Sequence, residues 1–506
     1  MHKLSFKTIL NNVTSPGKSL TQRVVVSGFW MFTLRILQKA FGFIRLIVLA
    51  RILFPNDFGL MGIALLTMST LETFSQTGFQ QALIQKKENI YSYLNSAWTF
   101  LILRRFILFG ILYLIAPYAA TFFHTPEAKS IIRIIGISIL IQAFTNIGVI
   151  YFKKELEFNK QFIYELAGTL ADFIVSVSAA LILRNVWALV FGLLAGDFAM
   201  CCLSYFLHPH RPRLNFDLGK LKELWGFGRW ISGSNIFTFL IMQGDDIFVG
   251  KILGATPLGF YQMAYRISNL PATEITHVIS QITFPAYSKL QESLPRLKEA
   301  YLKVFQLIVF LAFPAAGLIF ILASDFTKIF LGEKWMPMVP AMQVLCIFGV
   351  TRALNATTGS IFQAVGRPSI IAKVSFIQLI FLAAIIYPLV KMSNLVGVAW
   401  AVTLANFLCF VLAFREVLQI INESKTKIAR AVFPSLLATV ITICVIYLFR
   451  ALTVGRVSIF ITFFLSILIG FGMYSIYAKV SGFSFSSFLN SGNLFKKSVD
   501  IKTWGK

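Results

Sequence analysis

The stretch ARILFPNDFGLMGIA, residues 50–64, returns 200 positions later as GKILGATPLGFYQMA, residues 250–264. Four positions are identical and one is conservative, in the pairs Ile52/Ile252, Leu53/Leu253, Gly59/Gly259, Ala64/Ala264 and Arg51/Lys251. Two more identities in this register are Gly28/Gly228 and Trp30/Trp230, and at an offset of 209 Asn185-Val186 and Asp197-Phe198 fall on Asn394-Leu395 and Asn406-Phe407. These matches predict a chain built by duplication.

The repeat lies in a strongly apolar chain. Of the 506 residues, 57% are hydrophobic and 13% are charged, and the mean hydropathy is +0.75. Soluble domains are about 25% charged, so the composition predicts an all-α polytopic membrane protein. We expect about fourteen transmembrane helices, at 24–49, 58–82, 93–119, 130–151, 164–183, 186–207, 226–249, 258–284, 304–323, 338–363, 369–390, 394–414, 429–449 and 457–478.

Loop charge supports this topology. An even number of spans puts both termini on one side, and that side holds 28 of the 46 Lys and Arg residues, whereas the opposite loops hold 10. Because positive loops stay in the cytoplasm, both termini are predicted to be cytoplasmic. The same distribution explains much of the net charge of +25 and argues against nucleic acid as a partner.

The repeat places six spans between its copies, so both copies insert in the same orientation. We therefore expect two pseudo-symmetric six-helix bundles around a central cavity, with a parallel repeat axis along the membrane normal. The predicted domains are an N-terminal bundle (1–207), a cytoplasmic linker (208–225), a C-terminal bundle (226–420), two additional helices (421–480) and a cytoplasmic tail (481–506).

No predicted loop is long enough for a soluble catalytic domain, and no phosphate-binding loop motif is present. The five cysteines fall in apolar stretches and form no metal or disulfide pattern. We therefore expect a transporter rather than an enzyme, with no metal and no cofactor.

Polar residues share faces of several predicted spans, as helical spacing shows. Since each intramembrane charge costs about 2.5–3.5 kcal/mol on insertion scales, these faces predict a polar cavity. The predicted substrate-binding residues are Arg35, Gln38, Lys39 and Arg45, then Gln262, Arg266 and Asn269, and then Arg352 and Asn355. Four acids, Glu72, Asp245, Asp246 and Glu274, would couple transport to ions or pair with the cations.

Arginine suits phosphate because its guanidinium forks onto two oxygens and keeps its charge. The alternative is that these charges form ion pairs that hold helices together. Arg35 with Glu72, and Arg45 with Asp245, are the pairs considered.

Several segments resemble Wzx-type polysaccharide flippases of the colanic and teichuronic acid exporter branch. They are VLARILFPNDFGLMGIALL (48–66), ETFSQTGFQQALIQKKE (72–88), NVWALVFGLLAGD (185–197), FGRW (227–230), LGATPLGFYQMAYRISNLP (253–271), FPAYSKLQ (284–291) and QAVGRP (363–368). The resemblance covers most of the chain up to about residue 420.

The resemblance implies membership of the MOP superfamily, which includes MATE exporters and the lipid II flippase. It implies flipping of an undecaprenyl-diphosphate-linked oligosaccharide across the bacterial inner membrane, for exopolysaccharide or lipopolysaccharide biosynthesis. By position, Arg35, Arg45 and Arg266 would hold the diphosphate. Implied partners are the lipid-linked oligosaccharide, membrane lipids, and a polysaccharide polymerase with a chain-length regulator. The alternative function is ion-coupled, MATE-like export of small molecules, for which an acidic and aromatic cavity is expected.

Overall fold

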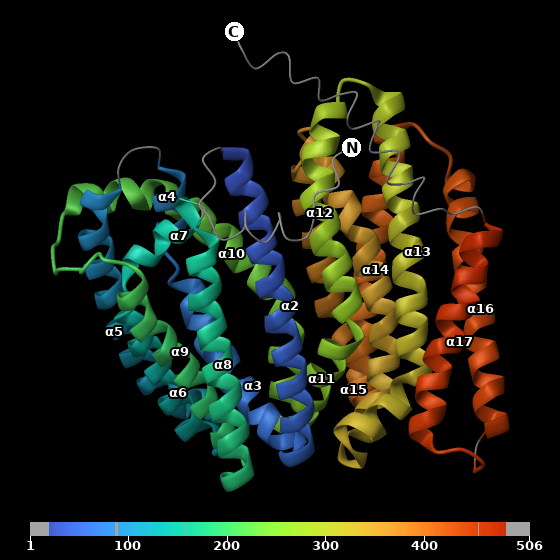
Figure 1. The fold of residues 1–506 in the computed structure, drawn as a ribbon, viewed down its shortest axis with the longest axis horizontal. Coiled ribbons are helices and arrows are strands. Elements are labelled where there is room, and N and C mark those ends of the chain that lie inside the picture. Colours follow the sequence, from blue (N-terminus) through green and yellow to red (C-terminus); the bar gives the residue numbers. More distant parts are fainter. Residues whose placement is uncertain (1–19, 87–89, 156, 454, 482–506) are drawn as a thin grey trace. The chain divides into compact units, whose positions relative to one another are not determined.

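A computed structural model describes residues 20–86, 90–155, 157–453 and 455–481. All elements in these ranges are helices (Figure 1). The chain divides into two compact units, Met1–Gly259 and Phe260–Lys506. The predicted tail lies outside the described residues from position 482 onward, as do the first nineteen residues.

The first unit is built from long helices with short breaks. Its elements are α2 (Leu20–Ile52), α3 (Pro55–Phe74), α4 (Phe79–Gln85), α5 (Tyr91–Phe122), α6 (Ala128–Ala143), η1 (Ile147–Val149), α7 (Ile150–Lys154), α8 (Phe158–Leu183), α9 (Trp187–Leu207), α10 (Leu218–Ile252) and the beginning of α11 (Ala255–Ser268).

The second unit continues from α11. Its further elements are α12 (Leu270–Leu290), α13 (Leu294–Phe326), the π-helix η2 (Thr327–Leu331), the 3₁₀-helix η3 (Glu333–Met338), α14 (Val339–Ala364), α15 (Ser369–Ile421), α16 (Lys425–Thr453) and α17 (Ile459–Val480).

These helices confirm the all-α membrane fold, but they do not confirm the count of fourteen spans. Within the described residues, eight helices are long and apolar enough to cross a membrane, and the number rises to ten if each of two bent pairs is one span. The bent pairs are α3 with α4, at 53°, and α6 with α7, at 74°. α2 is absent from this set although it has 33 residues; the sequence gives it three mid-helix charges.

Two predicted spans merge in α15. The helix is interrupted at Ser393 and Asn394, where Asn394 has φ 47° and ψ −123°. A Cβ built on Gly397 would lie 2.0 Å from the carbonyl oxygen of Leu389, so the chain reverses there and packs back on itself. The predicted boundary between spans 369–390 and 394–414 thus falls at this break.

The duplication is visible in the backbone. α2 ends at Ile52 and α10 at Ile252, and α3 and α11 begin at Pro55 and Ala255. Both α2 and α10 end with an equivalent hydrogen bond. The Leu53 N–H donates to the Leu49 carbonyl, and the Leu253 N–H donates to the Val249 carbonyl, both at 2.8 Å. The repeat predicted from residues 50–64 is therefore a repeat of structure.

Glycines let α8 and α9 approach closely. A Cβ on Gly192 would lie 2.5 Å from Cβ of Ser176 and 2.6 Å from Oδ1 of Asp172, and a Cβ on Gly196 would lie 3.0 Å from the carbonyl oxygen of Gly168. Gly192 and Gly196 form a G-x-x-x-G spacing, which favours close helix packing in membranes because apolar attraction between helices is weak there.

The chain between α9 and α10 is held by aromatic and polar contacts. The His208 ring stacks on Tyr151, with centroids 5.4 Å apart, and Asn146 donates a 2.6 Å hydrogen bond from Nδ2 to the carbonyl oxygen of His210. His210 is only 5% exposed. Burial, followed by the nearby charge of Arg211, lowers the pKa of its imidazole. This imidazole is therefore suited to remain neutral.

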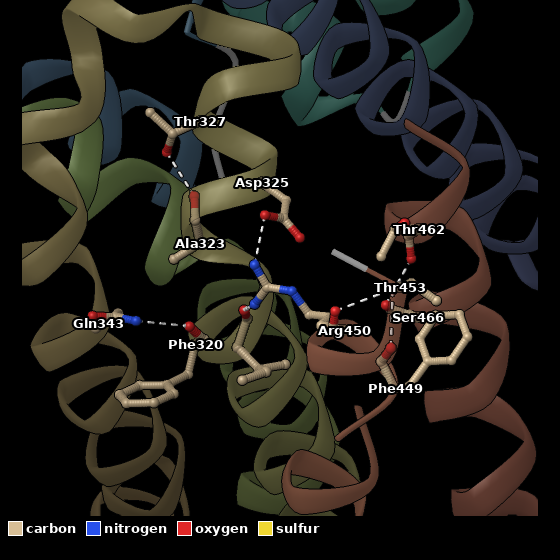
Figure 2. Close-up of polar contacts among 11 residues, drawn as sticks. Phe320, Ala323, Asp325, Thr327, Gln343, Phe449, Arg450, Thr453, Thr462 and Ser466 are labelled. Atoms are coloured by element: carbon tan, nitrogen blue, oxygen red, sulfur yellow. Dashed lines mark hydrogen bonds and ion pairs between the residues drawn. The ribbon is translucent and has the colours of Figure 1, made fainter. Parts of the chain in front are cut away.

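The additional helix α16 is anchored to α13 by an arginine (Figure 2). Arg450 donates from Nη1 to the carbonyl oxygen of Ile321 and from Nη2 to Oδ1 of Asp325, both at 2.6 Å. Glycines complete the packing: Gly317 of α13 lies against Thr439 of α16, and Gly470 of α17 lies against Leu318 of α13. The second unit thus includes α16 and α17 as packed elements.

Candidate functional site

Arg45 is engaged inside the first unit. Its Nη2 lies 2.7 Å from Oδ1 of Asp172 in α8, and its Nε donates a 2.9 Å hydrogen bond to Ser176 Oγ. The predicted pair of Arg45 with Asp245 is therefore wrong; Asp172 is the partner because it faces α2 from the neighbouring helix. One guanidinium that was predicted to bind substrate is thus already occupied.

The remaining predicted residues of α2 differ in their surroundings. Gln38 donates from Nε2 to Glu165 Oε2 at 3.4 Å, and Glu165 also accepts a hydrogen bond from Gln161 of its own helix. Lys39 is exposed. Arg35 is half-buried, and within the described parts of the chain it makes no hydrogen bond and no ion pair. Among the described residues of α2, Arg35 is therefore a half-buried cation that a ligand can pair with.

Glu72 lies in a buried network of charges, and its electrostatic partners are Arg104 and Arg105 of α5. The predicted pair of Glu72 with Arg35 is wrong for this reason. Arg104 also donates to the carbonyl oxygens of Ser75, at 2.8 Å, and of Glu72, at 3.1 Å, at the end of α3. Cations are favoured at a helix C-terminus, so Arg104 stabilises the break between α3 and α4.

The same network continues to Asp197 of α9. Asp197 accepts hydrogen bonds from Ser138 and from Gln142 Nε2, the latter at 3.3 Å, and both donors lie on α6. The Gln142 Oε1 atom accepts from Arg105 at 3.5 Å. Gln142 thus connects the Asp197 carboxylate to the arginines of α5.

The second unit contains a counterpart of this centre. Asn406 of α15 donates from Nδ2 to Thr351 Oγ1 at 2.6 Å, and its Oδ1 accepts from Asn355 at 3.3 Å. Asn406 corresponds to Asp197 at the offset of 209. In both units, this residue, on α9 or on α15, bonds to two side chains four positions apart on one neighbouring helix. The two copies share this hydrogen-bond geometry, but the carboxyl group of Asp197 in the first copy is replaced by the neutral amide of Asn406 in the second.

Other predicted residues lie around this second centre. Arg352 donates from Nη1 to the Tyr265 hydroxyl at 3.1 Å. Asn269 is 2% exposed, and a Cβ on Gly349 would lie 3.5 Å from its Oδ1. Within the described residues, the Oδ1 atoms of Asn269 and Asn355 are buried and have no hydrogen-bond partner. This unit therefore holds acceptors that a polar ligand or water can satisfy.

The last predicted residues occupy several environments. Asp245 is buried and Asp246 half-buried on α10, Gln262 is half-buried and Arg266 exposed on α11, and Glu274 is half-buried on α12. Each of these five takes part in interactions within the protein. Four residues of these networks were not predicted as site residues: Arg104, Arg105, Gln142 and Glu165. For the first two, the available signal was a pair of adjacent arginines inside an apolar stretch.

A known protein family includes this chain. The model of the family described as "Polysaccharide biosynthesis protein" matches residues 48–340, more than half of the chain. The chain belongs to this family. The relatives include the Escherichia coli (strain K12) lipopolysaccharide biosynthesis protein WzxC, which is 25% identical over 399 residues, covering 78% of this chain and 81% of WzxC. This match confirms the resemblance to Wzx-type proteins.

A second relative is the teichuronic acid biosynthesis protein TuaB of Bacillus subtilis (strain 168), which is 27% identical over 65% of this chain and 70% of its own length. Among solved structures, the lipid II flippase MurJ in an inward closed conformation matches 90% of this chain and 98% of its own, with a TM-score of 0.73 and 15% identity. This polysaccharide biosynthesis family member therefore has the MurJ fold.

Proposed function

We propose that this protein flips an undecaprenyl-diphosphate-linked oligosaccharide from the cytoplasmic to the outer leaflet of the bacterial inner membrane by alternating access. It acts as a transporter and not as an enzyme. Family membership, the names of the relatives WzxC and TuaB, and the fold shared with a lipid II flippase support this proposal. Both termini lie in the cytoplasm in this account, as the loop charges predict.

The main structural observation in support of this proposal is the environment of Arg35. It is half-buried in an apolar helix and has no partner among the described residues. A lone charge at such a depth costs about 2.5–3.5 kcal/mol on insertion scales, and a bound anion offsets this cost. A diphosphate fits because guanidinium groups bind two phosphate oxygens at once. Arg45 is not the diphosphate ligand in this account, because Asp172 neutralises it.

The second unit would provide contacts for sugar hydroxyls. Arg352 and Tyr265 form a hydrogen-bonded pair, and Asn269 and Asn355 carry acceptors without partners. Hydroxyl groups donate and accept hydrogen bonds and therefore suit such side chains. Arg266 is exposed on α11 and would make a further phosphate contact.

The Glu72–Asp197 network would respond to the driving ion. It contains two carboxylates of α3 and α9 whose charge is balanced by Arg104 and Arg105. Its counterpart in the second unit is centred on the neutral Asn406. An acid that is present in only one copy of a repeat suits a role in ion binding that the other copy does not share.

The direct test is transport by the purified protein in liposomes that contain a fluorescent diphosphate-linked oligosaccharide lipid. Flipping makes the lipid accessible to a membrane-impermeant quencher faster than in protein-free liposomes. Excess unlabelled lipid-linked oligosaccharide should slow the quenching of the labelled lipid by competing for the transporter, whereas cationic drugs should not slow it. Competition by the drugs alone would instead support a MATE-like exporter. A polymerase and a chain-length regulator are not required for this reaction and would act on its product.

A further inference from the structure

α5 and α6 pack side by side in the first unit (Figure 1). α5 is apolar and long enough to span a membrane, and only 17% of its apolar stretch is buried inside the protein. Phe106, Ile107 and Leu114 are among the exposed side chains of this helix. Since exposed apolar residues of a membrane-spanning helix contact lipid tails, this surface of α5 faces the acyl chains of the bilayer.

An arginine of α6 lies on the same surface. Arg133, in the second turn of α6, holds its guanidinium over the Tyr113 ring of α5, with Cζ 4.2 Å from the ring centroid. Its Nε also donates a 3.4 Å hydrogen bond to the carbonyl oxygen of Tyr113. Tyr113 is itself 45% exposed. The guanidinium is therefore held at the surface of the helix pair and not inside it.

The two terminal nitrogens of this guanidinium remain available to a ligand. Within the described residues, Arg133 forms no ion pair, and it donates a hydrogen bond only from Nε. Lys129 is exposed, and its ammonium group has no partner in the same part of the chain. Residues four apart on a helix are neighbours on one face, so one ligand can contact both cations. Glu127, the exposed N-cap residue of α6, forms an ion pair with neither of them.

The start of α6 favours an anion at this place. The N-terminus of a helix carries about half a positive charge, so acidic residues are preferred in the first turn and cations are disfavoured. The first turn of α6 contains no acid, and it contains Lys129. An unpaired cation on a lipid-facing surface also costs free energy. A bound anion would offset both costs, and phosphate suits the arginine because a guanidinium binds two phosphate oxygens at once.

An open apolar surface continues from the two cations along the helix pair. Gly110 and Phe106 lie three and seven residues before the tyrosine, on the same face of α5, and Ile137 lies four residues after the arginine on α6. Phe106 and Ile137 are exposed, and a Cβ on Gly110 would meet nothing within 4 Å. No described side chain therefore covers the backbone at this glycine, and a lipid tail can lie against it.

We propose that Arg133, Lys129 and Tyr113 form a binding site for the phosphate group of an anionic glycerophospholipid. The arginine holds two phosphate oxygens, the lysine contacts the same headgroup, and the tyrosine ring keeps the guanidinium in position. An acyl chain of the lipid lies on the apolar surface between α5 and α6. The occupant is a lipid of the bilayer because the surface faces the bilayer. None of the residues proposed to bind the transported substrate lies on α5 or α6, so the site is independent of the proposed function.

The test measures where an anionic phospholipid binds and how tightly. Phosphatidylglycerol with a photoreactive group in one acyl chain is added to the purified full-length protein in micelles, and mass spectrometry identifies the labelled peptides after irradiation. We expect saturable labelling within residues 103–114 and 133–143. Excess unlabelled phosphatidylglycerol should suppress this labelling at least tenfold, whereas zwitterionic phosphatidylcholine with the same acyl chains should not.

Substitutions test the role of each cation. Arg133→Gln should raise the phosphatidylglycerol concentration for half-maximal labelling at least tenfold, because it removes a charge-assisted pair of hydrogen bonds. Arg133→Lys should cause a smaller shift, since it keeps the charge but loses the two-point contact. Lys129→Gln is a second variant that should fold normally, because this side chain is exposed and has no partner in the described residues. We expect it to shift half-maximal labelling at least threefold.

Lys251→Gln is the matched control. The Nζ atom of Lys251 also lies over an aromatic ring of α5, 4.5 Å from the Phe122 centroid, but outside the proposed site. This substitution removes one positive charge and should leave half-maximal labelling unchanged. Tyr113→Leu tests the positioning role of the ring. It should shift half-maximal labelling less than Arg133→Gln, and the shift should appear with phosphatidylglycerol and not with phosphatidylcholine.

Three results would overturn the site. Labelling that neither Arg133→Gln nor Lys129→Gln changes would show that these cations do not bind the phosphate. Equal suppression by phosphatidylcholine would show that the surface binds acyl chains without selecting an anionic headgroup. Suppression by undecaprenyl phosphate but not by phosphatidylglycerol would assign the surface to a polyprenyl lipid. None of these measurements involves transport, so the proposed function and the lipid site stand or fall separately.

Discussion

The ion pair of Arg45 with Asp172 provides a quantitative test of whether an intramembrane charge is structural. The two side chains are 22% and 27% exposed and lie 2.7 Å apart, and Arg45 also bonds to Ser176. Replacing Arg45 by Met removes the guanidinium that lies against the Asp172 carboxylate, and an uncompensated charge inside the membrane costs about 2.5–3.5 kcal/mol on insertion scales. Replacing both residues removes the stranded charge as well as the pair.

We therefore expect Arg45→Met to lower the free energy of unfolding by about 2–3 kcal/mol. The double variant Arg45→Met/Asp172→Leu should lie within about 1 kcal/mol of the wild type, since polar contacts between membrane helices contribute about 0.6 kcal/mol on average. Equilibrium unfolding in mixed micelles measures both values, and the double variant should still flip substrate.

Arg35→Met is the matched control on the same helix. Because Arg35 has no partner in the described residues, this substitution should not destabilise the protein. The reasoning is refuted if the double variant is as unstable as Arg45→Met, which would mean that Arg45 and Asp172 are not energetically coupled.

Three further predictions follow from the packing, the linker and the repeat. Gly192→Ala should cost about 1–3 kcal/mol in unfolding experiments because its Cβ would overlap Ser176 and Asp172, whereas Gly110→Ala, with nothing within 4 Å, should not. Because the His210 pKa is lowered in the folded protein, its stabilising effect is complete above its unfolded pKa of about 6.5 and is lost as the pH falls through the folded value. Limited proteolysis of the linker should therefore speed up below about pH 6.5. His210→Phe should weaken this dependence, and the remainder belongs to His208, whose pKa burial also lowers. Asp197→Asn should fold, since Asn406 occupies the equivalent position, and should lose the stimulation of flipping by an imposed proton gradient while keeping gradient-independent flipping.

The helical membrane fold and the repeat could be predicted from the sequence, because long apolar segments indicate the fold and matching residues indicate the repeat. The offset of 200 between residues 50–64 and 250–264 reappears in the ends of α2 and α10, and the match of Asp197 with Asn406 reappears as two polar centres. Breaks were harder to locate. The bends between α3 and α4 and between α6 and α7 fall inside the predicted spans 58–82 and 130–151, at residues 75–78 and 144–146, and no proline marks them.

The partners of charged residues could not be predicted, because they depend on which helices are neighbours. Arg45 was expected to face Asp245 by repeat symmetry, yet α8 lies against α2 and supplies Asp172. Arg104 and Arg105 were not predicted as site residues, and the structure shows them inside the continuous helix α5, balanced by Glu72. In both cases the partner depends on packing between helices that are far apart in the sequence, and the pattern within one helix does not show which helices are neighbours.

The central claim is that a diphosphate-linked glycolipid moves across the membrane with Arg35 as its phosphate ligand. The most direct measurement is the initial flipping rate of a fluorescent diphosphate-linked oligosaccharide lipid in proteoliposomes, for wild type, Arg35→Lys and Arg35→Gln. The account predicts at least a tenfold loss in Arg35→Gln and a smaller loss in Arg35→Lys, which keeps the charge but loses the bidentate fork. Neither substitution should lower the free energy of unfolding. Equal rates in all three proteins would contradict the role of Arg35, and no flipping by the wild type would contradict the account as a whole.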